Sequence, residues 1–130
     1  MTPKKILVFA SISGLLCVCL GALGAHAFKD KLEVTLPTYE KAVLYQLFHT
    51  LALFVLFIIS LKFSDKKFLY TGWFWIAGII LFSGSLYCYS LIKGSHNENF
   101  NWLVHITPFG GMSFMIGWLM LFLGAMKIKP

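Results

Sequence analysis

Residues 6–28 read ILVFASISGLLCVCLGALGAHAF, a stretch without Asp, Glu, Lys or Arg that decides the fold. The hydrocarbon core of a bilayer is about 30 Å thick, and a helix of about 20 apolar residues crosses it. Three further stretches, 38–61, 68–92 and 108–126, have the length and apolar character of such a span. Lipid offers no hydrogen bonds to a free backbone, so each span has to be helical. The sequence therefore predicts an all-α fold, an integral membrane four-helix bundle in which residues 1–130 form a single transmembrane domain.

The composition agrees with lipid as the solvent. Charged residues are 12% of the chain and hydrophobic residues 58%, whereas a soluble domain carries about 25% charged residues. The net charge of +6 does not indicate nucleic-acid binding, because the chain has no Arg and its Lys residues lie in short clusters between the apolar stretches. The expected partner is the lipid bilayer, and no nucleic acid is expected.

The placement of the lysines predicts the orientation in the membrane. Seven of them, Lys4, Lys5, Lys62, Lys66, Lys67, Lys127 and Lys129, fall on one side of the four spans, and four, Lys29, Lys31, Lys41 and Lys93, fall on the other. Loops rich in Lys stay in the cytoplasm, so both termini are expected there. Ala25-His26-Ala27 imitates the cleavage site of a secretory signal, but the apolar stretch before it exceeds the about 7–15 residues of such a signal. We therefore expect the first span to be retained.

Polar side chains inside the spans are the main functional indication, because they are costly in lipid. In the second span, Tyr39, Tyr45, Gln46 and His49 recur at spacings that place them on one helix face. The candidate ligand-binding residues are His49, Gln46, Tyr45, His26, Ser83, Ser85, Tyr87, Thr107, Gly110 and Gly111. The topology brings them to the non-cytoplasmic side, and the helical rise of about 1.5 Å per residue predicts a polar layer in the outer third of the bundle, above an apolar interior.

A structural interpretation stands beside this one. Ser and Thr hydroxyls in membrane helices often bond to their own backbone carbonyls, and Gln46, His49 and Tyr87 could bind one another across helices. The regularly spaced glycines of the first and fourth spans predict close helix contacts, either within the chain or in a homodimer. Trp75, near the start of the third span, is expected at the membrane interface.

Catalytic, metal and cofactor sites are not predicted. Ser85 and His49 at matching depth are the only hint of a nucleophile and a base, and no third group is evident that would orient them. The cysteines are explained as small packing residues, since Cys17 and Cys19 point to nearly opposite helix faces. Haem or metal binding through His26 and His49 is a lesser alternative. We expect a protein without enzymatic activity and without a cofactor.

Four motifs, one in each span, are similar to those of a known family. They are Gly21-Ala22-Leu23-Gly24-Ala25-His26, Tyr45-Gln46-Leu47-Phe48-His49-Thr50, Leu81-Phe82-Ser83-Gly84-Ser85-Leu86-Tyr87 and Thr107-Pro108-Phe109-Gly110-Gly111. In this order, and over nearly the whole chain, they resemble the YgdD-like family of small membrane proteins, which carries domain of unknown function 423. The resemblance implies a four-span, multi-pass protein of the bacterial inner (plasma) membrane, and it implies no activity.

The sequence leaves two functions open. In the first, the polar layer binds a small molecule, a lipid or a proton, with His49, Gln46 and Tyr45 at the ligand and His26 at the entrance. In the second, the protein is a structural or assembly partner of a larger membrane complex. A homo-oligomer or a membrane-protein partner is compatible with either function.

Overall fold

The computed structural model describes residues 1–63, 65–93 and 101–128. Helices α1 (Pro3–Ala25) and α2 (Leu36–Lys62) are followed by α3 (Lys66–Gly78), which continues through a π-helical segment (Ile79–Ser83) into α4 (Gly84–Lys93); a 3₁₀ turn (Asn101–His105) then leads into α5 (Thr107–Ala125). Within these residues, four helical rods are long and apolar enough to cross a membrane: α1, α2, the α3–α4 rod (Lys66–Lys93), and α5 with the 3₁₀ turn before it (Trp102–Ala125). The predicted fold, an all-α membrane four-helix bundle, is confirmed.

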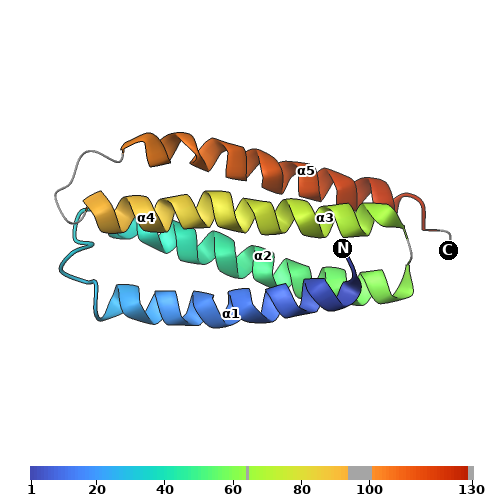
Figure 1. Cartoon of the computed structure of the whole chain (residues 1–130), viewed down its shortest axis with the longest axis horizontal. Coiled ribbons are helices and arrows are strands. Elements are labelled where there is room, and N and C mark those ends of the chain that lie inside the picture. The colour runs from blue at the N-terminus through green and yellow to red at the C-terminus, as the bar shows by residue number, and fades with distance from the viewer. Residues whose placement is uncertain (64, 94–100, 129–130) are drawn as a thin grey trace.

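The rods run up and down along the bundle in chain order (Figure 1). The N-terminus, the α2–α3 connection and the end of α5 lie together at one end of the bundle, here named the lysine-rich end. The described lysines there are Lys4, Lys5, Lys62, Lys66, Lys67 and Lys127, while Lys129 lies outside the described residues. The connection between α1 and α2, with Lys29 and Lys31, lies at the opposite end.

Local sequence explains where the helices begin and end. Pro3, Pro37 and Pro108 each stand in the first turn of a helix, where the missing N–H has no helical partner to lose. Asp65 caps α3, because its carboxylate accepts a hydrogen bond from the backbone N–H of Lys67 at 2.8 Å. The first helix covers Pro3–Ala25 instead of the predicted 6–28, so His26 follows the helix. The π-helical part of the third span has no signal in the sequence pattern.

α5 packs on the α3–α4 rod through a repeating contact between glycines and aromatic residues, the glycine seam. The pairs are Gly124 with Phe68, Gly117 with Trp75, and Gly110 with Phe82. Successive members stand seven residues apart on both rods, so the contact stays on one side of each helix. A Cβ atom on any of these glycines would lie closer than 3.0 Å to its partner. The small residues of the fourth span therefore pack within the chain, as the first of the two interpretations predicted.

α1 packs on α2 through a second close contact. A Cβ atom on Gly14 would lie 3.6 Å from the side chain of Thr50, an ordinary contact distance. Farther along, the ring of Tyr39 covers Gly24 so closely that no side chain fits there. The Tyr39 hydroxyl also donates a hydrogen bond to the carbonyl of Leu20 at 2.6 Å. The two antiparallel pairs, α1 with α2 and the α3–α4 rod with α5, thus each have a seam of their own.

The buried apolar residues form two clusters with polar residues between them. The larger cluster contains Ile6, Ala10, Leu53, Leu56, Phe68, Trp75, Ile76, Ile79 and Phe114. The smaller contains Leu32, Tyr39, Ala42 and Tyr87. Trp75 is only 1% exposed, so the expectation of an interfacial Trp75 is wrong. It stands nine residues into the rod and faces α5, where Gly117 leaves room for its ring.

Candidate functional site

One group of candidate residues forms a hydrogen-bonded chain across three helices, the polar network (Ser13, Gln46, Thr50 and Tyr87). Gln46 stands at its centre and is 4% exposed. Its side-chain nitrogen donates to the carbonyl of Ser13 at 3.0 Å, and its side-chain oxygen accepts from the Tyr87 hydroxyl at 2.8 Å. The hydroxyls of Ser13 and Thr50 are bonded at 2.7 Å. The network joins α1, α2 and α4 at a buried position, where an unmade hydrogen bond is costly.

His49 belongs to a second group, the aromatic cluster (Tyr45, Phe48, His49, Trp75, Phe82, Phe114 and Trp118). Its ring is 3% exposed and lies flat on Phe114, with centroids 3.5 Å apart and planes inclined by 10°. Nδ1 of His49 lies 2.9 Å from the carbonyl oxygen of Tyr45, and Nε2 lies 3.3 Å from Nε1 of Trp118. An indole N–H only donates, so Nε2 is the acceptor and Nδ1 carries the proton. His49 is therefore neutral, with both ring nitrogens engaged.

Ser85 and Thr107 form a third group, which links α4 to the start of α5. Their hydroxyls are 2.8 Å apart, and the Ser85 hydroxyl also donates to the carbonyl of Phe82 at 3.0 Å. The pairing that the sequence hinted at, Ser85 with His49, is not formed, because each of the two side chains is bonded elsewhere. The Ser85–Thr107 hydrogen bond therefore joins the α3–α4 rod to α5.

The π-helical segment brings three further candidates together. Gly110 lies directly against the backbone of Phe82, and Gly111 is in ordinary contact with the Phe82 ring, where a Cβ atom would be 3.9 Å away. Ser83 is 1% exposed, and its hydroxyl has no hydrogen-bond partner among the described residues. π-helical turns often mark functional positions. Here the segment meets the first turn of α5, where a Cβ atom on Gly110 would lie closer than 3.0 Å to the backbone nitrogen of Phe82.

The ten candidates therefore do not converge on one pocket. His26 is exposed beyond the end of α1, and the side chain of Tyr45 is 41% exposed on the lipid-facing side of the aromatic cluster. Two side chains that bond to the candidates were missed, Ser13 with Gln46 and Trp118 with His49, and so was Thr50, which bonds to Ser13. Thr50 stands beside His49 in its motif and could have been included, whereas Ser13 and Trp118 become evident only from the register between helices.

The polar layer also extends deeper than predicted. Ser13 stands ten residues from the start of α1 and twelve from its end, and Thr50 stands fourteen and twelve residues from the ends of α2. The bonded pair therefore lies near the middle of the bundle and not in its outer third. The long side chains of Gln46 and Tyr87 connect this pair to residues nearer the outer end, which a calculation of backbone depth does not take into account.

Metal-binding side chains do not gather in the part of the chain that the structure describes. No three His, Cys, Asp or Glu side chains come together there as a metal site requires. Of the cysteines, Cys17 is buried while Cys19 and Cys88 are exposed, and all three are free thiols.

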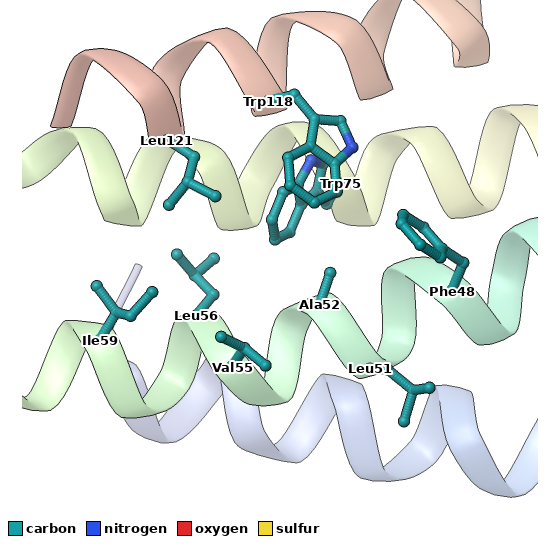
Figure 2. Close-up of a pocket in the computed structure, with 9 residues that line it drawn as sticks. All are labelled: Phe48, Leu51, Ala52, Val55, Leu56, Ile59, Trp75, Trp118 and Leu121. Atoms are coloured by element: carbon teal, nitrogen blue, oxygen red, sulfur yellow. The ribbon is translucent and has the colours of Figure 1, made fainter. Parts of the chain in front are cut away.

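An apolar groove runs between α2 and α5, and its floor is Trp75 of α3 (Figure 2). In this α2–α5 groove, Ala52 and Leu56 of α2 face Trp118 and Leu121 of α5 across the gap. The lining residues are Phe48, Leu51, Ala52, Val55, Leu56, Ile59, Trp75, Trp118 and Leu121, around a cavity of about 300 Å³. The groove opens sideways from the bundle, since Phe48 and Val55 on its rim are more than half exposed.

A second hollow, the lysine hollow, lies between the ends of α2 and α5 at the lysine-rich end. Its lining residues are Lys62, Phe63, Asp65, Phe68, Gly124, Lys127 and Ile128, around about 370 Å³. The backbone N–H of Lys67 donates to Asp65 and lowers the pKa of its carboxyl below the usual value, and the charges of Lys67 and Lys127 act in the same direction. Asp65 is therefore ionised, and it also lies 3.9 Å from the ammonium group of Lys67.

Comparisons with known proteins agree with the motifs. Residues 20–111 match the family described as Protein of unknown function (DUF423). The chain is 38% identical over 130 residues to the UPF0382 inner membrane protein YgdD of Escherichia coli (strain K12). This match covers 99% of this chain and 95% of that protein. It is 39% identical over 126 residues to the UPF0382 membrane protein YwdK of Bacillus subtilis (strain 168), covering 95% of this chain and 98% of the relative. No solved structure matches the chain.

Proposed function

We propose, from the premise that this chain belongs to the DUF423 family of membrane proteins, that it binds a membrane lipid by holding one hydrocarbon chain in the α2–α5 groove. The groove itself carries the proposal. It is lined by apolar side chains, it is elongated from Phe48 to Ile59, and it opens sideways where a spanning bundle meets lipid. Its volume falls at the lower end of the range of ligand pockets, about 300–1,000 Å³. Of the three ligand classes considered, small molecule, lipid and proton, the groove fits a lipid best.

The polar residues support this function as positioning groups. The Gln46 amide is bonded on both sides within the polar network, so little hydrogen-bonding capacity is left for a polar ligand. His49 accepts the indole N–H of Trp118, and Trp118 is one wall of the groove. In this proposal the buried polar groups fix α2 against α1, α4 and α5, and the groove keeps its width as a result.

We also propose that the protein acts by binding and not by catalysis. In support, Ser85 is bonded to Thr107, and both ring nitrogens of His49 are engaged. The location proposed is the bacterial inner membrane, where the name of the Escherichia coli relative places that protein. The bias of the lysines supports an orientation with both termini in the cytoplasm.

The test is native mass spectrometry of the protein purified in a mild detergent. We expect a lipid adduct on the native chain and its loss in Ala52→Phe, which fills the groove. The matched control is Leu44→Phe, which adds an aromatic ring to a different groove, between α1 and α2, and should keep the adduct. Absence of lipid from the native chain would contradict the proposal. So would a second copy or another protein in place of the lipid, which would favour the assembly function.

A further inference from the structure

The lysine hollow follows the α2–α5 groove along the same side of the bundle, about one helical turn farther toward the lysine-rich end. α2 supplies Phe48 to Ile59 to the groove and Lys62 to the hollow, on one side of the same helix. α5 supplies Leu121 to the groove and Gly124 to the hollow, and Lys127 stands two residues after the end of this helix. α3 lines both hollows as well, with Trp75 in the groove and Phe68 in the lysine hollow. These two residues stand seven apart on α3, and both pack on α5 through the glycine seam. The two hollows therefore lie in line along one side of the bundle, and we treat them as one elongated surface with an apolar part and a charged end.

The length of this surface matches one leaflet of a bilayer. Phe48 and Lys62 are fourteen residues apart in α2, which corresponds to about 21 Å along the helix axis. A bilayer with its headgroup layers is about 40–45 Å thick, so one leaflet with its headgroups measures about 20–22 Å. A lipid with its headgroup at Lys62 would therefore end its chain beside Phe48 and Trp118, near the middle of the bundle.

The charge of the hollow selects the headgroup. Its lining contains two lysines, Lys62 and Lys127, and one carboxylate, Asp65. That carboxylate is already engaged, because it accepts the backbone N–H of Lys67 at 2.8 Å and lies 3.9 Å from the ammonium group of the same residue. Among the described residues, the other acidic ones are Asp30, Glu33 and Glu40, and they lie at the opposite end of the bundle, between α1 and α2 and near the start of α2. The lining thus presents excess positive charge to whatever lies at the end of the groove.

From this alignment, length and charge we infer that the lipid is an anionic glycerophospholipid of the leaflet at the lysine-rich end, with its phosphate against Lys62 and Lys127 and one acyl chain in the α2–α5 groove. The inference rests on the proposed function and adds the lipid class and leaflet. A zwitterionic headgroup such as phosphoethanolamine is disfavoured, because its ammonium group would face two lysines while the carboxylate beside them is engaged.

The test compares two lipids that share their acyl chains, palmitoyl-oleoyl phosphatidylglycerol and palmitoyl-oleoyl phosphatidylethanolamine, by titration into the delipidated full-length protein and native mass spectrometry. We expect phosphatidylglycerol to bind about tenfold to thirtyfold more tightly, as the attraction of an anionic lipid for two lysines implies. The double variant Lys62→Gln/Lys127→Gln should lose this preference while it still binds both lipids weakly. Lys29→Gln, at the opposite end, is the charge control and should keep the preference.

The outcomes separate this inference from the function on which it rests. Equal binding of both lipids by the native chain, abolished by Ala52→Phe, would overturn the anionic headgroup and leave the lipid-binding function in place. A preference that survives the double lysine variant would also overturn it. Binding that Ala52→Phe does not change would show that the acyl chain lies elsewhere, and both proposals would fail. The lysine substitutions are on the surface of the bundle and do not test its ability to fold.

Discussion

At the scale of single residues, the buried polar side chains explain how an apolar bundle acquires a defined arrangement. Gln46 uses both ends of its amide, one toward Ser13 and one toward Tyr87. Apolar contacts between helices in lipid have no preferred direction, and the hydrophobic effect does not favour them there. These hydrogen bonds, in contrast, form in only one register of the helices. The polar network therefore specifies which face of α2 meets α1 and which meets α4.

The Tyr87 hydroxyl provides a direct test of this role. Tyr87→Phe removes only the oxygen and leaves the Gln46 side-chain oxygen without its donor. Interhelical hydrogen bonds in membrane proteins contribute about 0.6 kcal/mol on average and about 1.7 kcal/mol at most, so we expect the free energy of unfolding to fall by about 0.5–1.7 kcal/mol. Unfolding in mixed micelles or by steric trapping measures it. The control Tyr70→Phe, at an exposed tyrosine, should change nothing, and equal effects of the two substitutions would refute the role of the hydrogen bond.

Asp65 predicts a dependence of stability on pH. The N–H of Lys67 and the nearby lysine charges lower the pKa of this carboxyl in the folded protein. A group with a lowered folded pKa stabilises the protein above its unfolded pKa of about 4, and that contribution is lost as pH falls from there through the folded pKa. Asp65→Asn keeps a capping side chain but removes the titration. The difference in melting temperature between the two proteins should be constant at neutral pH and shrink below pH about 4; a difference independent of pH would exclude this mechanism.

The residues of the polar layer could be predicted from the sequence, but the side chains that they contact on other helices could not. Gln46 and His49 were placed correctly on one side of α2, yet Gln46 bonds to α1 and α4 while His49 stacks on α5. Residues three apart on a helix differ in direction by about 60°, which is enough to face different neighbours in a bundle. Whether a residue such as Trp118 is a partner depends on the register between helices, and that register cannot be inferred from a single sequence.

At the scale of the elements, the glycine seam sets the distance between α5 and the α3–α4 rod. We predict that Gly117→Ala destabilises the protein by about 1–3 kcal/mol, the usual range for overpacking, because the new methyl group would meet the Trp75 ring. The matched control is Gly84→Ala, where an added Cβ has nothing within 4 Å. That substitution should be neutral or stabilise the helix by up to about 1 kcal/mol. Unfolding measurements on both variants check the prediction, which fails if the two glycines behave alike.

The existence of the helical elements was predictable, and their internal detail was not. Long apolar stretches bounded by Pro37, Asp65 and Pro108 gave the spans within a few residues. The π-helical turn at Ile79–Ser83 has the apolar sequence IILFS, like the α-helical residues around it, so the pattern predicts regular α-helix there. Trp75 was assigned to the interface from its place in the sequence, because the glycine that accommodates its ring lies 42 residues away in α5.

At the scale of the whole molecule, the gathering of lysines at one end predicts the orientation in the cell. We expect a single cysteine at position 34, after replacement of Cys17, Cys19 and Cys88, to react with an impermeant thiol reagent on intact cells from which the outer membrane has been removed. Val34 is 86% exposed in the connection between α1 and α2. A single cysteine at Lys127 should react only after the inner membrane is permeabilised. The reverse pattern would contradict a cytoplasmic lysine-rich end.

The order of the rods in space follows their order along the chain. Each seam joins sequence neighbours, α1 to α2 and the α3–α4 rod to α5, and the polar network and aromatic cluster join the two pairs through α2. Contacts of this kind have a low contact order, which favours rapid folding. During synthesis, the first hairpin can close within the membrane before the second has left the ribosome, and no step has to wait for the last helix to find the first. The architecture is therefore suited to assembly hairpin by hairpin while translation is still under way.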